Sequence, residues 1–276
     1  ALSCAGEETD AEATPRPSSK VVLIRNENVV GEDGTIDASL IQQMLDEAVL
    51  TLFEERSPAE CWQSIIQPED VVGIKTNVWQ NLPTPSAVNE TLKNGVLAAG
   101  VPEDNIATAD RGLVNNELFQ NSTALINTRP MRTHAWSGVG SLIKNYITFV
   151  PRPPDYHDDA CANLATLWEL PVTRGKTRLN VLVMLTPQFH NVGPHHFDAS
   201  YVWNYGGLVV STDPVAADSV GLRIIQNKRT QVFGEDRPLQ PTAHHIALAD
   251  TVHHLGNADP NNIELISLGW DADILL

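Results

Sequence analysis

The chain is poor in basic residues, and it has no apolar run long enough to cross a membrane. Its 18 lysines and arginines stand against 34 aspartates and glutamates, so the formal net charge is −16. A surface this acidic repels phosphate backbones, and we therefore expect no nucleic-acid partner. Apolar stretches such as 179–185 are far shorter than the roughly 20 residues of a membrane-spanning helix. The sequence predicts no transmembrane helix.

Cysteine is also scarce. Cys4, Cys61 and Cys161 are an odd number without a C-x-x-C spacing, which argues against a zinc ribbon, a c-type haem site or an iron–sulfur cluster. At most one internal disulfide can form. The phosphate-binding P-loop and the H-E-x-x-H pattern of metalloproteases are missing as well. We expect no nucleotide motif and no intrinsic iron–sulfur cluster.

Residues 1–19 are acidic, rich in proline and serine, and without apolar periodicity, which is typical of a flexible tether. Their small-residue start is similar to the region that follows a removed export signal. It predicts an extracytoplasmic protein, whether periplasmic, secreted or surface-bound. Cys4 stands near the place of a lipoprotein acylation site, although Ala1 replaces the usual leucine. Lipidation of Cys4 and an ordinary flexible terminus remain alternatives.

After the tether, β-rich apolar runs alternate with amphipathic patterns. This alternation predicts an α/β fold with a mostly parallel sheet and helices on both faces. We expect one domain over 20–276, or two lobes, 20–112 and 179–276, joined by a helical insertion over 113–178. The predicted strands are 20–24, 70–74, 105–109, 180–185, 207–210 and 263–268. The predicted helices are 36–54, 87–99, 138–147, 159–170, 214–228 and 242–255.

Polar residues follow five of the predicted strands. They are Arg25-Asn26, Lys75-Thr76-Asn77, Asp110-Arg111, the loop that contains His190, and Ser211-Thr212-Asp213. Ligands of open parallel sheets bind beyond the carboxyl ends of the strands. The sequence therefore predicts a functional site at this edge, although turn residues alone explain part of the pattern.

The loop Q-F-H-N-V-G-P-H-H-F-D, residues 188–198, is rich in histidine. Imidazole is a common metal ligand, and a carboxylate can ligate or orient it. We predict a metal site formed by His190, His195 or His196, and Asp198, for a transition metal such as zinc, iron or copper. His195 and His196 are adjacent and would point to opposite sides in extended chain, so one of them is expected to ligate. A metal-free catalytic or binding histidine and a structural role are the alternatives.

Two further clusters are candidates for a site. In Y-H-D-D-A-C, His157 is a possible metal ligand, and Cys161 lies four residues later, at a spacing that places both on one helix face. In the segment 129–145, Arg129, Arg132, His134 and Lys144 concentrate positive charge in an acidic chain. Together with backbone amides at Gly138 and Gly140, these side chains suit an anionic substrate or cofactor. Balancing surface charge is the alternative.

The segment S-T-D-P-V-A-A-D, residues 211–218, begins a predicted helix. Asp213 followed by Pro214 has the form of an N-cap and a first helical proline. Asp218, one turn further on, is therefore the freer functional candidate.

The order of these motifs resembles that of the domain of unknown function 362 family. The resemblance rests on V-V-G-I-K-T-N, Asp110-Arg111, T-H-A-W-S-G-V-G-S-L-I-K-N, N-V-G-P-H-H and L-V-V-S-T-D-P-V-A-A-D, between residues 70 and 225. It implies an α/β fold and export by a twin-arginine signal. Some members carry ferredoxin-like cysteine clusters, which this chain lacks. The residues that match the family pattern are Lys75, Asn77, His134, Lys144, Asn145, Asp213 and Asp218.

The leading hypothesis is an exported protein with a metal or small-anion site at the carboxyl edge of its sheet, suited to metal-assisted hydrolysis or redox chemistry. Its predicted catalytic residues are Lys75, His134 and Asp218. Its predicted cofactor-binding or anion-binding residues are Asn77, Arg111, Lys144 and Asn145. The alternative is a non-catalytic accessory subunit that docks on a larger extracytoplasmic redox or surface assembly. A metal-free enzyme with His190 as general base and Lys75 as its electrostatic partner is the third hypothesis.

Overall fold

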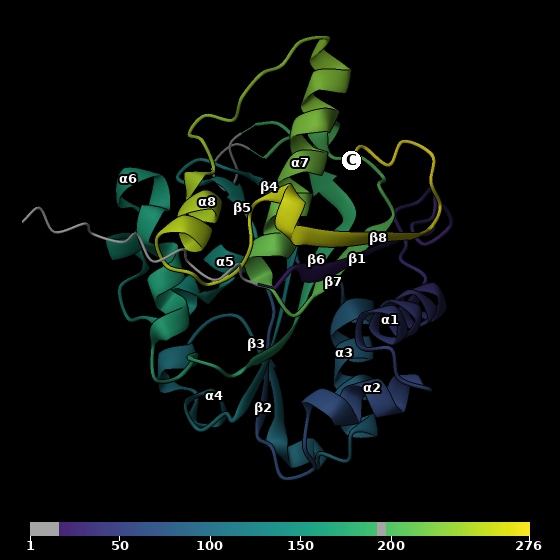
Figure 1. Ribbon diagram of the computed structural model, residues 1–276, viewed down its shortest axis with the longest axis vertical. Helices are drawn as coiled ribbons and strands as arrows, with labels where there is room; N and C mark the ends of the chain where they lie inside the picture. Colours follow the sequence, from purple (N-terminus) through teal and green to yellow (C-terminus); the bar gives the residue numbers. More distant parts are fainter. Residues whose placement is uncertain (1–16, 192–196) are drawn as a thin grey trace, which may run out of the picture.

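The computed structural model describes residues 17–191 and 197–276, and its centre is a mixed sheet of eight strands (Figure 1). The strand order is β3-β2-β4-β6-β7-β1-β8, and β5 pairs with β4 outside this path. The strands are β1 (Ser19–Arg25), β2 (Val72–Lys75), β3 (Ile106–Ala109), β4 (Ala124–His134), β5 (Gly138–Gly140), β6 (Thr177–Gln188), β7 (Gly207–Ser211) and β8 (Ile263–Gly269).

Most neighbouring strands run in the same direction. The pairs β1–β8, β2–β3, β2–β4 and β4–β6 are parallel, whereas β7 is antiparallel to both β1 and β6, and β5 is antiparallel to β4. The carboxyl ends of β1, β2, β3, β4, β6 and β8 therefore share one edge of the sheet. The prediction of an α/β fold with a mostly parallel sheet is confirmed.

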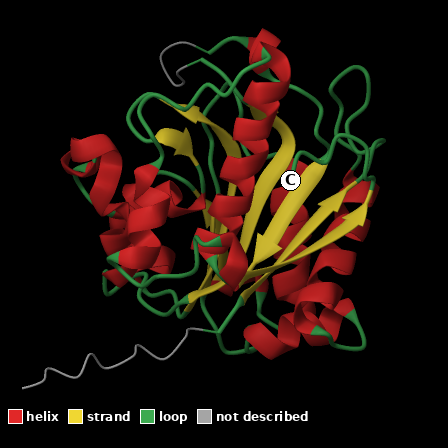
Figure 2. Cartoon of the chain, turned by 45° about the horizontal axis from the view of Figure 1, so that its top comes forward, coloured by secondary structure: helices red, strands yellow, loops and turns green. Residues whose placement is uncertain are grey.

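Helices cover both faces of the sheet (Figure 2). The α-helices are α1 (Ala38–Phe53), α2 (Pro58–Ile65), α3 (Ser86–Ala98), α4 (Glu117–Gln120), α5 (Leu142–Asn145), α6 (Asp158–Cys161), α7 (Pro214–Phe233) and α8 (His244–Thr251). Short 3-10 helices lie at Glu103–Asn105, Leu113–Asn115, Tyr146–Phe149, Pro153–Tyr156, Ala162–Glu169, Ala199–Tyr201 and Pro260–Asn262. Among the described residues, no helix is both long and apolar enough to cross a membrane.

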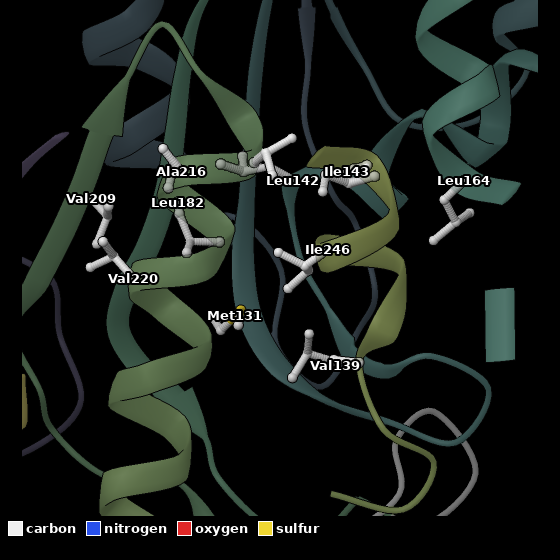
Figure 3. Packing of buried hydrophobic residues seen from close by; sticks show 14 of the residues in the cluster. Met131, Val139, Leu142, Ile143, Leu164, Leu182, Val209, Ala216, Val220 and Ile246 are labelled. Atoms are coloured by element: carbon white, nitrogen blue, oxygen red, sulfur yellow. The ribbon is translucent and has the colours of Figure 1, made fainter. Parts of the chain in front are cut away.

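Strand side chains alternate between two hydrophobic cores, one on each face. Val22 and Ile24 of β1 pack in the core under α1, α2 and α3, whereas Val21 and Leu23 point into the core under α5, α7 and α8. Figure 3 shows the second core, where side chains of β4, β6 and β7 meet those of α7 and α8. A strand buried on both faces needs a continuous apolar run, which explains the K-V-V-L-I pattern of β1.

The start of α7 agrees with its predicted capping. The Asp213 carboxylate accepts hydrogen bonds from the backbone N–H groups of Val215 and Ala216, at 2.8 and 3.1 Å, and Pro214 is in the first turn. At the other end, Gly234 has a φ of 72°, a left-handed conformation that suits glycine. The N-cap role of Asp213 is confirmed.

The middle of the chain differs from the predicted helical insertion. Ala124–His134 is a buried strand in the interior of the sheet, and Gly138–Gly140, expected to open a helix, pairs with it as β5. The sequence did not predict β4 as a strand for two reasons. Pro130 cannot donate to a strand ladder, and the strand contains three charged or amide side chains, which are uncommon in a buried strand. The ladder register shifts between Pro130 and Arg132, so the proline is accommodated at an irregularity.

The direction of β7 also differs from the expected arrangement. Only a short 3-10 helix lies in the described part of the connection from β6 to β7, whereas parallel neighbours need a longer crossover, usually a helix. The chain therefore returns antiparallel, and the pairing of β7 with β1 places Ser211 opposite Val21. Ser211-Thr212-Asp213 lie at the amino edge of the parallel strands, so their expected place at the carboxyl edge is wrong.

Candidate functional site

A cavity of about 270 Å³ lies at the carboxyl edge of the sheet, where the chain leaves β2, β3 and β4. Turns after these strands and the short helix α5 bring side chains from distant parts of the sequence into its wall. The lining residues are Asn77, Trp79, Asp110, Arg111, Arg129, Arg132, His134, Trp136, Lys144, Asn145, Ile147, Thr148, Pro153 and His157. The predicted catalytic, anion-binding or metal-binding residues among them are Asn77, Arg111, His134, Lys144, Asn145 and His157, and Arg129 and Arg132 of the predicted cationic cluster line the cavity as well.

Lys75 lies beneath this cavity rather than in its wall. Its fully buried ammonium group donates to Asp110 Oδ1 at 2.6 Å, to the Thr76 carbonyl at 2.7 Å and to Asn145 Oδ1 at 3.1 Å. Burial lowers the pKa of Lys75 to about 8, against the opposing effect of Asp110. Because all three N–H donors are used, the side chain joins β2, β3 and α5 and has no free N–H for a substrate.

Asp110 completes this ion pair. Although burial alone would raise its pKa, the Lys75 ammonium and hydrogen bonds from Lys75 and from the Val78 backbone N–H hold the pKa of Asp110 below its ordinary value. The carboxylate is therefore charged and already compensated by Lys75. Its charge also raises the pKa values of Arg129 and Arg132 against the effect of their burial, so it offsets part of the positive charge of the cavity wall.

Three polar residues of neighbouring strands form a buried row below α5. The strand register places Lys75 of β2 opposite Asn127 of β4, and Asn127 opposite Asn180 of β6. Asn145 Nδ2 donates to Asn127 Oδ1 at 2.8 Å, and Asn127 Nδ2 donates to Asn180 Oδ1 at 3.1 Å. This network fixes α5, and with it Lys144, relative to the sheet.

Arg129 and Arg132 are buried, but the structure leaves several of their donors unused. Arg129 Nε, Arg132 Nε and Arg132 Nη1 are inaccessible to solvent and have no hydrogen-bond partner among the described residues. Burial lowers the pKa of Arg129 to about 10 and lowers that of Arg132 as well. The Arg132 guanidinium lies 4.0 Å from the ring centre of Trp79, which holds it by a cation–π contact.

Gly140 makes room for one of these guanidinium groups. A Cβ atom at this position would lie 2.6 Å from Arg129 Nη2. The absence of a side chain at Gly140 therefore lets the buried Arg129 guanidinium pack directly against the backbone of the Gly-rich stretch. It was expected to provide the amides of a helix start, but Gly138 and Gly140 belong to β5.

Lys144 is the lysine that lines the cavity. Burial, aided by the charges of Arg129 and Arg132, lowers its pKa to about 8, although the nearby Cys161 opposes the shift. Its Nζ lies 3.3 Å from Cys161 Sγ, and that thiol is within 3.3 Å of the Trp136 carbonyl. With one weak acceptor identified, the ammonium keeps donors for a ligand.

The two histidines of the wall are neutral at neutral pH. Burial and the neighbouring positive charges lower the pKa of His134 strongly, and burial together with Lys144 lowers that of His157 to about 4. The Trp136 backbone N–H donates to His134 Nδ1 at 3.2 Å, so Nε2 carries the ring proton. His157 stacks on the Trp136 ring at a centroid distance of 4.3 Å. His134 therefore offers a neutral donor, and His157 lies against an aromatic ring; its predicted role as a metal ligand stays a prediction.

Asp218 lies under α5, outside the cavity wall. Its carboxylate accepts from the Ser141 hydroxyl at 2.6 Å and from the backbone N–H groups of Leu142 and Ile143 at 2.9 Å. Burial raises the pKa of Asp218 to about 7. The residue satisfies the first N–H groups of α5 and so positions Lys144, which is a different role from the predicted catalytic one.

His190 and Asp198 do not line this cavity. His190 lines a neighbouring hollow that shares His134 with it. The Arg229 guanidinium contacts His190 Nδ1 at 3.0 Å, and because arginine can only donate, His190 Nε2 carries the ring proton. Asp198 caps a short exposed turn by accepting from Ser200. His195 and His196 lie outside the described residues. Within 17–191 and 197–276, no group of three or more His, Cys, Asp or Glu side chains is arranged to hold a metal ion.

The strand-end rule overlooked part of the wall. Trp79, Trp136 and Thr148 line the cavity but were not among the predicted site residues. Trp79 follows β2 by four residues, so its place near the same edge was a usable signal. Thr148 comes from the 3-10 helix after α5, and no local pattern marks it.

Residues 101–223 match the family described as a domain of unknown function (DUF362). Searches of curated proteins and of solved structures gave no match. The matched segment contains Asp110, Arg129, Arg132, His134 and Lys144.

Proposed function

Because residues 101–223 match the DUF362 family, whose description names no reaction, we propose a function from the cavity itself. The cavity binds a small anion with a phosphate, sulfate or carboxylate group. Arg129, Arg132 and Lys144 supply the positive charge, and His134 supplies a neutral N–H donor. This proposal refines the expected metal or small-anion site in favour of the anion.

The unpaired guanidinium donors carry the proposal. Three buried guanidinium nitrogens, Arg129 Nε, Arg132 Nε and Arg132 Nη1, have no acceptor among the described residues. A buried donor without a partner costs about 1–3 kcal/mol, and more when it belongs to a charged group. Because these nitrogens have no accessible surface, an anion in the cavity satisfies them only after the guanidinium groups turn toward it. The bonds that it then accepts are charge-assisted, and such bonds are among the strongest in proteins.

The charge distribution supports the same ligand class. Four cationic side chains line the cavity, whereas the chain as a whole has a net charge of −16. Asp110, the carboxylate in the wall, is paired with Lys75. The volume of about 270 Å³ is many times the ~10–15 Å³ that a cavity needs to hold one water. A phosphate or a small carboxylate fits this space.

Catalysis on the bound anion is a second candidate function, and the position of Lys144 favours it. A lysine with a pKa of about 8 exchanges protons near neutral pH, as a general acid or base must. Lys75, predicted as catalytic, has the same lowered pKa, but its three hydrogen bonds occupy it. Lys144 is therefore the better candidate for proton transfer.

The test is anion binding measured by calorimetry and thermal unfolding, with phosphate, sulfate and citrate as probes in a chloride buffer. A ligand at one hundred times its dissociation constant stabilises the folded state by about 2.7 kcal/mol. Arg132→Gln should weaken binding by tenfold or more, because it removes charged donors worth about 1.5–3 kcal/mol. Arg174→Gln is the matched control, since Arg174 is exposed and pairs with Glu169 at 3.0 Å. Equal binding by both variants, or no binding of any probe, would overturn the proposal.

Metal binding by His190, His195, His196 and Asp198 stays a prediction, as do export and an accessory role. In the present geometry a metal would bind His190 through Nδ1 only after the Arg229 contact is broken. Metal analysis of the purified protein and of His190→Ala distinguishes the two site types. Stoichiometric metal that is lost in the variant would favour the histidine loop.

A further inference from the structure

A second hollow adjoins the cationic cavity. It has a volume of about 570 Å³ and is lined by Arg111, Gly112, Val114, Asn115, Thr148, Val150, Pro151 and Pro153. Arg111, Thr148 and Pro153 line both spaces. The cavity is therefore continued at one side by a larger hollow, which we call the side groove.

The side groove is much less charged than the cavity. Val114, Val150, Pro151 and Pro153 provide apolar surface, and among the described residues Arg111 is its one charged lining residue. Val114 is 37% exposed and Trp136, in the cavity wall, is 40% exposed. A concave, mostly apolar surface beside a few converging polar groups is typical of a small-molecule site.

A polar atom marks the junction of the two spaces. Thr148 Oγ1 is inaccessible to solvent and has no hydrogen-bond partner among the described residues. Thr148 lines both hollows. Since Oγ1 has no accessible surface, a ligand polar atom at this junction, such as an ester oxygen, reaches it only after the Thr148 side chain turns.

We propose that the ligand is an amphipathic organic anion, with its head in the cationic cavity and its apolar body in the side groove. The inference rests on the proposed anion binding and adds the class of ligand. An inorganic anion would fill the cavity and leave the side groove empty. The head contacts Arg129, Arg132 and Lys144, and the body packs on Val114, Val150 and Pro151.

The test uses inorganic phosphate and its methyl, propyl and pentyl monoesters as probes in calorimetry with the whole chain. Burial of one methylene contributes about 0.8 kcal/mol, which is roughly a fourfold gain in affinity. Since part of the alkyl chain stays in contact with water, we expect a gain of about twofold to fourfold per methylene from methyl to pentyl phosphate.

Two variants locate the gain. Val114→Asn should lower the affinity for pentyl phosphate by about fourfold, which is the contribution of roughly one buried methylene. It should leave the affinity for inorganic phosphate unchanged. Val232→Asn is its control, since Val232 is an exposed valine near the end of α7. Arg132→Gln should weaken all four probes.

The outcomes separate this inference from the proposed function. Binding of inorganic phosphate without any gain along the series would overturn the amphipathic ligand and leave anion binding standing. A gain that Val114→Asn does not reduce would place the alkyl chain elsewhere and would also overturn the inference. Failure of all four probes to bind would overturn both.

Discussion

Replacing Lys75 with methionine should lower the free energy of unfolding by about 3–5 kcal/mol. Methionine keeps an unbranched chain in the buried space but removes the ammonium group. The Asp110 carboxylate, which is 6% exposed, would then be a buried charge without its cation. The lost bonds give a similar magnitude, because a bond to a charged group contributes about 1.5–3 kcal/mol and each neutral bond about 1 kcal/mol.

Urea unfolding followed by circular dichroism measures this loss. Lys93→Met is the matched control, since Lys93 forms a surface ion pair with Glu103 at 2.6 Å. Such pairs contribute about 0–1 kcal/mol. The double variant Lys75→Met/Asp110→Asn should recover part of the stability, because it removes the uncompensated charge and keeps an acceptor for the Val78 N–H.

A loss below about 1 kcal/mol for Lys75→Met would refute the reasoning. Removing the partner of a buried charge should lower the free energy of unfolding by more than the loss of a surface ion pair does. A double variant no more stable than the single one would refute the charge argument in particular. The loss would then come from the Thr76 and Asn145 acceptors.

Three further predictions concern the cavity. Gly140→Ala should reduce phosphate affinity by about tenfold in calorimetry, the value of one charge-assisted bond, because its Cβ would displace the Arg129 guanidinium; unchanged affinity would show that this group does not contact the anion. Asp218→Ala should lower the free energy of unfolding in urea by about 3 kcal/mol, because it leaves three donors at α5 without an acceptor, and a loss under about 1 kcal/mol would contradict the capping role. Sulfate affinity should fall as the pH rises from about 7 to 9, because Lys144, with a pKa of about 8, loses its charge. The Lys144→Met variant should bind sulfate more weakly at neutral pH, and its sulfate affinity should depend less on pH. A pH dependence that the variant does not alter would exclude Lys144 as the titrating group.

Much of the sheet could be predicted because its strands are apolar and short. β1, β2, β3, β6, β7 and β8 all lie where β-rich runs were found, to within a few residues except at the ends of β6. β4 could not be recognised, since Asn127, Arg129 and Arg132 are buried in it for reasons that only the assembled site reveals. A strand whose side chains serve a polar network has no amphipathic period.

The site could be predicted in part. The rule that ligands lie beyond strand carboxyl ends pointed to Asn77 and Arg111, and the charge cluster pointed to Arg129, Arg132, His134 and Lys144. The direction of β7 and the position of His190 depend on pairing between distant segments. Local patterns carry no information about these, so residues 211–213 were assigned to the wrong edge.

The position of β1 has a consequence for synthesis on the ribosome. This strand lies between β7 and β8, and both of these partner strands belong to the last third of the chain. Neither edge of β1 can pair until that part has been synthesised. The 182 residues from 26 to 207 take roughly 9–36 s to translate at about 5–20 residues per second. Throughout that time the V-V-L-I segment has α1 as a native neighbour but no native strand partner, so its open edges can aggregate. We expect the yield of folded protein to depend on chaperones that hold this segment.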